Sequence, residues 1–488
     1  MTIFYWIIFI IYCASMIYIG VLGKRRTKDA NDYFVAGRSF GIWMAVPFFV
    51  ASYISAGTMV GYAGFAYWQG WFLLSRFSIG LMLSMITLQL FSRKFYNAKS
   101  MWYSTTDVFA ERFEEETFMR RILSVYIIMN TLLLIFWQLM GIGTVLEVFL
   151  GMPYVWSILI VGAVFIFYTA YGGMFSVAWT NVIQCTLLFF CIVMGGIWAI
   201  NQAGGLSVVN AHIATLGEGD MRGAMMSFTF NGRYSMALII GTWLNLALTV
   251  PCNVFYQRVF FSLDSARTAR SMIGYSSFAV MLVYFTIVLV GIAGTVLMPD
   301  LKEPEQIFPK LVSMMPPFFA ALTVSGIVAA IQSSIDTQLL SASTIATNDF
   351  YKNVFNKNAT PQQLIKVSSY CTIAFGILAV VLAMFRPGTM MEVYYIIISL
   401  NSSIIFPTML LGLFWKRTTK QAAIFGLCFG AIGCYSWLQF GPRDIPPSLV
   451  IVPLALIGMV IISLCTKPAS DATLAKFFEV RKPQPVKP

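Results

Sequence analysis

The stretch AAIQSSIDTQLLSAS, residues 329–343, lies in a long apolar run, yet it carries an acid, two glutamines and several hydroxyls. Polar groups buried in an apolar medium without partners are energetically costly. If the run is helical, residues three, four and seven positions apart share one face. That face then holds Ala330, Ser333, Ser334, Thr337 and Ser341. The pattern predicts a helix whose polar side meets another polar element inside an apolar medium.

The composition identifies this medium as a lipid membrane. Of the 488 residues, 58% are hydrophobic and 11% are charged, whereas soluble proteins carry about 25% charged residues. One crossing requires roughly 20 apolar residues in a helix. The chain is therefore expected to be an all-α polytopic membrane protein with about thirteen transmembrane helices, at residues 2–23, 41–67, 71–92, 121–149, 153–171, 178–200, 235–260, 272–298, 316–346, 366–385, 389–415, 420–440 and 447–465.

The basic residues predict how these helices are oriented. If the spans alternate, 25 of the 32 lysines and arginines fall on one side and six on the other. Loops rich in lysine and arginine face the cytoplasm. We therefore expect a multi-pass protein of the plasma (inner) membrane, with the N-terminus outside and a cytoplasmic tail at residues 466–488. The net charge of +12 is divided among short loops, which argues against a nucleic-acid partner.

The residues that usually carry enzymatic or metal chemistry are sparse. The eight cysteines lie in apolar runs without metal-ligand spacing, and the single histidine, His212, lies in a polar loop. Neither a nucleophile triad nor a phosphate-binding loop is apparent. The sequence predicts a protein that is not an enzyme and has no organic cofactor.

Two apolar runs carry residues that interrupt helices. VASYISAGTMVGYAGFAYWQG (50–70) has small and polar residues in its middle, and IIGTWLNLALTVPCNVFYQ (239–257) contains Pro251. Interrupted membrane helices at corresponding positions are typical of inverted repeats, and their freed carbonyls can bind ions. We therefore expect repeats at about 41–200 and 235–415. The alternative is close helix packing through small residues together with an ordinary proline kink.

The polar face at 329–343 offers ligands for a cation. Sodium, like other hard cations, prefers oxygen ligands. The hydroxyls of Ser333 and Ser334, the carbonyl of Ala330 and carbonyls from residues 51–58 are candidates. Alternatively, the serines bond only to carbonyls one turn back in their own helix.

Four motifs resemble the sodium/solute symporter family, most closely its proline and pantothenate branch. They are DYFVAGRS (32–39), YTAYGGMFSVAWTNVIQ (168–184), AAIQSSIDTQLLSAST (329–344) and FPTMLLGLFWKR (406–417). The resemblance implies a LeuT-like fold, in which a five-plus-five inverted repeat has one helix before it and two after it. Residues 1–465 would then form a single transmembrane transporter domain.

The resemblance also implies a sodium site at matching positions. Its ligands would be the carbonyls of Ala51, Ile54 and Ala330 and the hydroxyls of Ser333 and Ser334. Na+ is the only metal ion expected.

The chain departs from the family at a possible second ion site. Members that bind a second sodium ion carry aspartate where this chain has Asn181, so we expect one sodium per solute. A second ion would involve Asn181 and Asp336. Alternatively, Asp336 orients its own helix or closes a gate with a basic residue.

Candidate solute contacts lie near the interrupted helices. Trp243 aligns with an aromatic of the proline branch, although it is equally consistent with a core tryptophan. Arg76 lies inside a span, where its guanidinium suits a carboxylate, but it could also pair internally or extend to the surface. The remaining candidates are Ser55, Thr58, Gln138 and Asn401.

The predicted function is sodium-coupled import of a small organic solute by alternating access. Branch resemblance favours a carboxylate-bearing metabolite such as an amino acid or a pantothenate-like acid. The alternatives are a proton-coupled or sugar/polyol-specific symporter of the same fold, or a solute-sensing membrane receptor. The expected partners are the solute, Na+ and the lipid bilayer, with the protein acting as a monomer.

Overall fold

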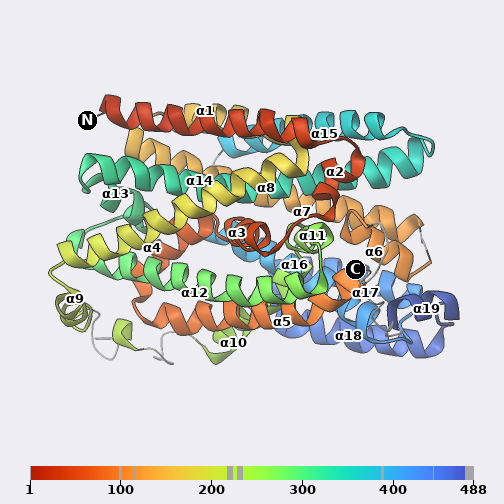
Figure 1. Ribbon diagram of the computed structural model, residues 1–488. Coiled ribbons are helices and arrows are strands. Elements are labelled where there is room, and N and C mark those ends of the chain that lie inside the picture. The colour runs from red at the N-terminus through yellow and green to blue at the C-terminus, as the bar shows by residue number, and fades with distance from the viewer. Residues whose placement is uncertain are drawn as a thin grey trace.

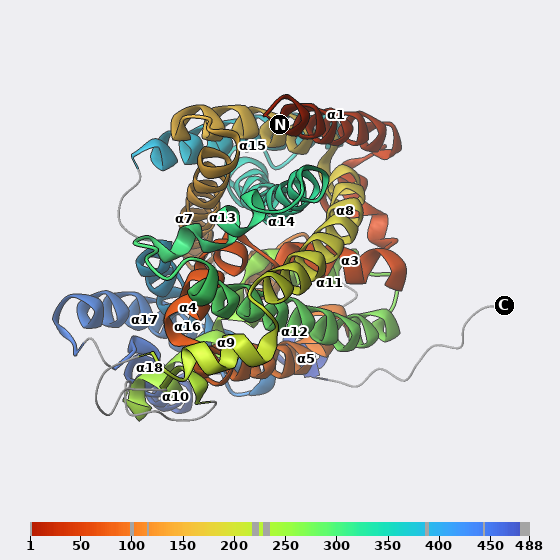
Figure 2. The same ribbon diagram turned by 90° about the vertical axis from the view of Figure 1, so that its left-hand side faces the viewer.

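The computed structural model describes residues 2–97, 102–114, 117–216, 224–227, 235–385, 390–442 and 445–478. In these ranges the regular structure is helical, apart from one isolated bridge between Phe40 and Leu263. Figure 1 shows the long helices side by side along one direction, and Figure 2 views the bundle from its end.

The long helices follow the apolar runs. They are α1 (Thr2–Arg26), α3 (Ile42–Tyr53) continued by η2 (Gly57–Tyr62) and α4 (Ala63–Gln69), η3 (Leu74–Ser78) continued by α5 (Ile79–Asn97), α7 (Thr117–Leu150), α8 (Tyr154–Gln202), α10 (Met236–Cys252) continued by α11 (Val254–Ser262), α12 (Ala266–Leu297), α14 (Pro317–Ile345) continued by η7 (Ala346–Phe355), α15 (Pro361–Met384), α16 (Met390–Phe414), α17 (Lys420–Phe440) and α18 (Pro447–Cys465).

Short helices connect or flank these spans. They are α2 (Ala30–Val35), η1 (Ala36–Arg38), α6 (Thr105–Arg112), α9 (Leu206–Ile213), η5 (Ala224–Met226), η6 (Pro304–Gln306), α13 (Ile307–Ser313) and α19 (Asp471–Phe478).

Helix α8 is two spans rather than one. Its 49 residues would extend about 74 Å at 1.5 Å per residue, more than twice a hydrocarbon core of roughly 30 Å. The non-helical residue Gly173 (φ 60°, ψ −152°) interrupts it. Ser176, just after this glycine, bonds to Gly20 of α1, whereas Gln184 bonds to Tyr12, which lies earlier in α1. The second half of α8 therefore runs antiparallel to α1.

The first half of α8 runs in the opposite direction. Tyr168, five residues before Gly173, also lies against Gly20. The end of α7, which precedes α8, lies beside the start of α1, where the rings of Tyr5 and Phe149 are 4.5 Å apart. The chain thus reverses at Gly173. Among the described residues ten helices can span a membrane, and two bent pairs raise this number to twelve. Counting α8 as two spans brings it to the thirteen expected from the sequence.

Both predicted interruptions are present. The first lies between α3 and η2, where Ile54 is extended (φ −79°, ψ 128°) and the axis bends by 60°. The second lies at Asn253, two residues after Pro251, where the axis bends by 44° between α10 and α11. Each bend lies where the helical hydrogen-bond pattern is interrupted. At the first, the backbone of Ile54 is extended, and at the second, Pro251 lacks a backbone N–H.

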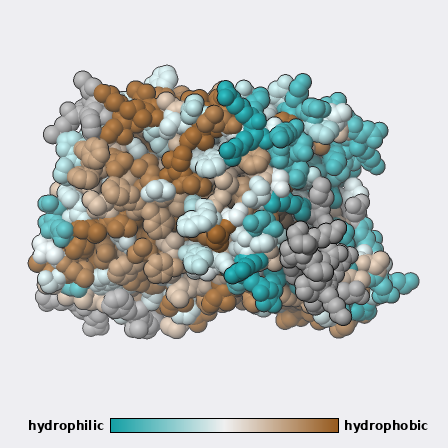
Figure 3. Space-filling model, in the orientation of Figure 1, coloured by the Kyte–Doolittle hydropathy of each residue, from teal (hydrophilic) through white to brown (hydrophobic). Residues whose placement is uncertain are grey.

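In Figures 1 and 2, α3 and α11 lie in the middle of the bundle, whereas α10 lies at its lower edge. Helix α14 packs on α7, α8 and α15, whereas α12 packs on α4 and α5, and α10 packs on α5 and α16. Helix α3 contacts α8, α12 and α14 and so lies between these groups. Figure 3 shows hydrophobic residues over the left part of one face and hydrophilic residues gathered toward the right end, as expected of a surface that is partly covered by lipid.

The C-terminal tail contains a helix, α19, that is not expected from the sequence. The Phe477 ring of α19 stacks on Trp102 with centroids 5.8 Å apart, and Lys476 pairs with Glu111 of α6. The Ser470 backbone N–H donates to Glu114 at 2.7 Å and lowers the pKa of that carboxyl. These contacts hold the start of the tail against α6. The final RKPQPVKP, for which disorder is the expectation, lies outside the described residues.

Candidate sodium and solute sites

The structure brings the five predicted sodium ligands together. Ser333 Oγ lies 2.7 Å from the carbonyl oxygen of Ala51 and 2.8 Å from that of Ala330. Ser334 Oγ lies 2.9 Å from the carbonyl oxygen of Ile54. All five residues are fully buried. Two elements far apart in sequence thus supply a set of neutral oxygens that suits a hard cation.

The carbonyls of Ala51 and Ile54 are free of helical hydrogen bonds because α3 ends at Tyr53. Instead of continuing the helix, the Ser55 N–H donates to Thr58 Oγ1 at 3.3 Å, and the Ala56 N–H donates to Gln138 Oε1 at 2.7 Å. The Ser334 hydroxyl has both of its carbonyl partners, those of Ser52 and Ile54, on the bent segment. The serines therefore do more than bond within their own helix, which was the alternative for this face.

The partner of Gln138 is thus the backbone of the first interruption. The second interruption is held in a similar way, because Asn401 Nδ2 of α16 donates to Asn253 Oδ1 at 2.6 Å. Asn401 Oδ1 in turn accepts from Tyr126 Oη at 2.9 Å. Each break in a helix is therefore stabilised by an amide side chain from another helix, as buried polar groups require.

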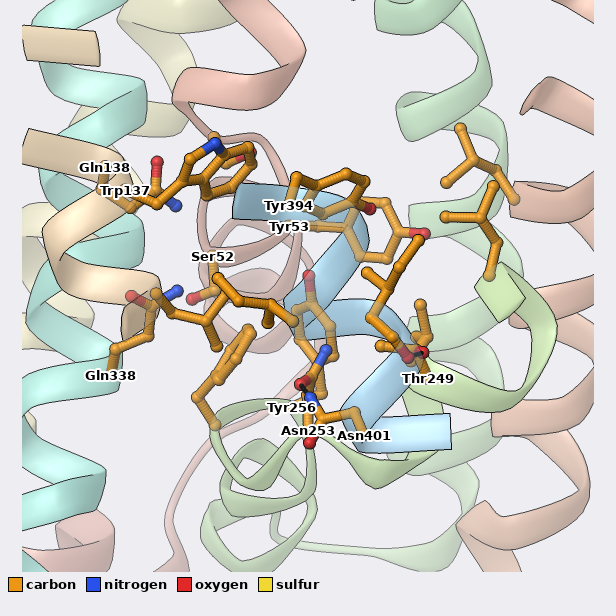
Figure 4. A pocket seen from close by; sticks show the side chains of 18 of the residues that line it. Ser52, Tyr53, Trp137, Gln138, Thr249, Asn253, Tyr256, Gln338, Tyr394 and Asn401 are labelled. Atoms are coloured by element: carbon orange, nitrogen blue, oxygen red, sulfur yellow. Dashed lines mark hydrogen bonds between the residues drawn. The ribbon is translucent and has the colours of Figure 1, made fainter. Parts of the chain in front are cut away.

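A cavity of about 50 Å³ lies between the two interruptions (Figure 4). Of the predicted solute contacts, Ser55, Gln138 and Asn401 line it. Aromatic pairs form much of its wall: Tyr53 stacks on Tyr256 with centroids 5.2 Å apart, and Trp137 stacks on Tyr394 at 4.9 Å.

These four aromatics and the polar lining residues Thr249, Asn253 and Gln338 are not among the solute contacts expected from the sequence. A signal for some of them was present. Tyr53 and Trp137 immediately precede predicted site residues, and Tyr256 follows the second interruption by three residues. Tyr394 had no such signal, because only the packing of α16 brings it here.

Three candidates lie apart from this cavity. Thr58 lines a smaller adjoining cavity with Ser55, and its hydroxyl lies 2.9 Å from Tyr284 Oη. Trp243 lines neither cavity and donates its indole N–H to the Ser75 carbonyl at 2.8 Å. Its contact is therefore with the helix backbone.

Arg76 also lines neither cavity. Only 5% of its surface is exposed, and Nη2 donates to Tyr395 Oη at 3.0 Å. The side chain is turned into the protein rather than toward the surface, which argues against the surface-extended conformation.

Asn181 and Asp336 have different partners. Asn181 Nδ2 lies 3.3 Å from both Ser52 Oγ and Thr337 Oγ1. Asp336 accepts hydrogen bonds from Tyr168 and from Thr169 of α8, the latter at 3.3 Å. In the described part of the chain, Asp336 forms no ion pair with a basic residue. Its contacts hold α14 against α8, in keeping with an orienting role.

Comparison with known proteins decides the family. The model of the sodium:solute symporter family matches residues 33–430. The chain belongs to this family. Its family and fold are those of transporters rather than enzymes, and family membership supports Na+ as the coupling ion.

Similar proteins include several named transporters. The osmoregulated proline transporter OpuE of Bacillus subtilis (strain 168) is 25% identical over 97% of each chain. The sodium/glucose cotransporter of Vibrio parahaemolyticus is 28% identical over 93% of this chain and 89% of its own. The sodium/pantothenate symporter of Escherichia coli (strain K12) is 27% identical over 89% and 91%, respectively.

Solved structures agree on the fold. A substrate-bound, outward-open Na+-coupled sialic acid symporter matches with a TM-score of 0.83 and 22% identity, over 96% of this chain and 99% of that one. Mhp1, a nucleobase-cation-symport-1 family transporter, matches with a TM-score of 0.59 and 14% identity, over 91% and 97%. The chain therefore has the LeuT-like fold that its motifs imply.

Proposed function

We propose that this protein imports a small organic solute together with one sodium ion by alternating access. The observation that carries the proposal is the pairing of Ser333 and Ser334 on α14 with the carbonyls of Ala51 and Ile54 at the first interruption. A cation bound there joins two elements from different parts of the bundle. Coupling requires that sodium stabilise one conformation over another. A site between two elements meets this requirement if the elements move apart in the other conformation, because the ion then loses ligands.

The proposed solute is a carboxylate-bearing metabolite such as an amino acid or a pantothenate-like acid. The proline and pantothenate relatives support this class. A sugar or polyol is the second candidate, because amide groups and stacked aromatic rings line the cavity and a sodium/glucose cotransporter is among the relatives. Proton coupling is the corresponding alternative for the ion.

The proposal includes the arrangement in the membrane. Residues 1–465 form one transporter unit with inverted repeats at about 41–200 and 235–415, each containing one bent helix. The N-terminus faces outside and the C-terminal tail faces the cytoplasm, as the lysine and arginine bias indicates. The monomer is the functional unit.

Sodium should stabilise the purified protein. A ligand that binds the folded state raises its stability by about 2.7 kcal/mol at 100 times its dissociation constant. We expect the melting temperature to rise with NaCl concentration and to change much less with KCl at equal ionic strength. Equal responses to the two salts would contradict a sodium site. A metabolite panel screened with and without sodium then identifies the solute.

Replacing Asn181 with aspartate should create a second cation site. Asn181 Oδ1 is buried and makes no hydrogen bond with the described residues, and the hydroxyls of Ser52 and Thr337 lie beside the amide. A carboxylate there adds the missing charge. We expect the sodium-to-solute ratio, measured from reversal potentials in proteoliposomes, to rise from one to two. A wild-type ratio of two would show that the amide already suffices.

A further inference from the structure

An apolar groove of about 440 Å³ lies on the outside of the bundle, away from the ion and solute sites. Three elements form it. Helix α7 contributes Met129, η7 contributes Phe350 and Phe355, and α15 contributes Cys371 and Phe375. Met129 and Phe355 are 60% and 77% exposed, respectively, so these side chains have no protein cover along much of their surface.

The groove has the length of an acyl chain in one leaflet. On α15 its lining residues Val367, Cys371 and Phe375 recur every four positions and so follow one face of the helix. Val367 and Phe375 are eight positions apart, which corresponds to about 12 Å at 1.5 Å per residue. Half of the hydrocarbon core is about 15 Å. The groove therefore runs from the end of the helix toward the middle of the membrane.

Three basic residues lie close in the chain to lining residues of this groove, near the starts of α7 and α15 and near the end of η7. Arg121 precedes the lining residue Val125 by one helical turn, Lys352 follows Tyr351 directly, and Lys366 directly precedes Val367. Arg121 and Lys366 are exposed and Lys352 is partly exposed. Within the described ranges, none of the three forms an ion pair.

The neighbouring Arg120, unlike these three residues, has carboxylate partners within the protein. Its guanidinium turns inward and pairs with Asp107 at 3.0 Å and with Asp349 at 2.8 Å. Arg120 is therefore neutralised by protein carboxylates, whereas Arg121, Lys352 and Lys366 keep exposed surface and have no carboxylate partner among the described residues. Basic pockets between membrane helices bind anionic lipid headgroups.

We propose that this groove holds one acyl chain of an anionic phospholipid, with the headgroup phosphate bound by Arg121, Lys352 and Lys366. The charge of the rim selects an anionic headgroup, and the apolar wall accommodates the chain. Because η7 directly continues α14, which carries Ser333 and Ser334, the lipid braces the end of the helix that supplies the ion-site hydroxyls.

The test is lipid binding to the full chain in detergent, measured by native mass spectrometry with phosphatidylglycerol and phosphatidylcholine of identical acyl chains. We expect phosphatidylglycerol to bind more tightly. The triple variant R121Q/K352Q/K366Q should lose this preference, with affinity falling on the order of tenfold or more. The matched control is R25Q/R267Q/R270Q, which removes three exposed basic residues that lie away from the groove.

A second variant tests the acyl site separately. C371W fills the groove and leaves the rim charges intact, so it should weaken phosphatidylglycerol binding while the melting temperature in detergent stays near that of the wild type. Glycerol phosphate, which has no acyl chain, should not compete. The proposal is overturned if both lipids bind equally, if the rim and control variants behave alike, if C371W binds lipid normally, or if glycerol phosphate displaces the lipid. The measurement requires neither sodium nor solute.

Discussion

Replacing Ser333 and Ser334 together with alanine should raise the sodium concentration that half-saturates the protein by about tenfold or more. Each hydroxyl lies within hydrogen-bonding distance of carbonyls on the bent segment. Interactions of polar groups with a charge contribute roughly 1.5–3 kcal/mol each, and about 1.4 kcal/mol corresponds to tenfold in affinity. Sodium titrations of the melting temperature measure the effect without knowledge of the solute, and uptake measures it once the solute is known.

The matched control for this experiment is S341A. Ser341 lies on the same buried helix, but its hydroxyl donates to the Thr337 carbonyl of that helix at 2.7 Å and does not reach the bent segment. We expect the sodium dependence of S341A to match that of the wild type. If the double variant also responds to sodium as the wild type does, the ion-site assignment is wrong.

Replacing Gly173 with alanine should have the largest effect on folding. At φ 60° and ψ −152° this residue occupies a backbone region that essentially only glycine adopts. An added Cβ would lie 2.5 Å from Tyr33 Cδ2, and the Tyr33 ring is itself buried. Backbone strain and overpacking each cost about 1–3 kcal/mol. We expect a lower yield of folded protein and a clearly lower melting temperature.

The matched control for G173A is the substitution of Gly274 by alanine. Gly274 lies within α12, and an added Cβ there meets no atom within 4 Å. Because alanine favours a helix over glycine, G274A should melt at or slightly above the wild-type temperature. Equal melting of G173A and G274A would mean that the reversal inside α8 does not require a glycine.

Much of the fold follows from local features of the sequence. The length of each apolar run predicts a span because one crossing needs a set number of helical residues. Pro251 and the small residues around Gly57 predict interruptions, since each weakens helical hydrogen bonding where it stands. The gap between the predicted spans that end at 171 and begin at 178 places the reversal within α8, and Gly173 lies in that gap.

Local features did not reveal how the proposed solute cavity is built. Gln138 and Asn401 are both amides in apolar helices, and both bond to the interruptions as well as line the cavity. Trp243, in contrast, bonds to the backbone at Ser75. The helix α19 was missed because its Phe477 gains a partner only when Trp102 lies opposite.

The sequence by itself determined the membrane class, the number of spans, the two bent helices and the polar face of α14, because each depends on residues close together in the chain. Only the tertiary structure decided which polar groups meet across that face. Ser333 and Ser334 lie against carbonyls some 280 positions away, whereas Asp336, on the same helix, turns to Tyr168 and Thr169. The physical reason is that a buried polar group is stabilised by whichever partner the packing of helices places beside it.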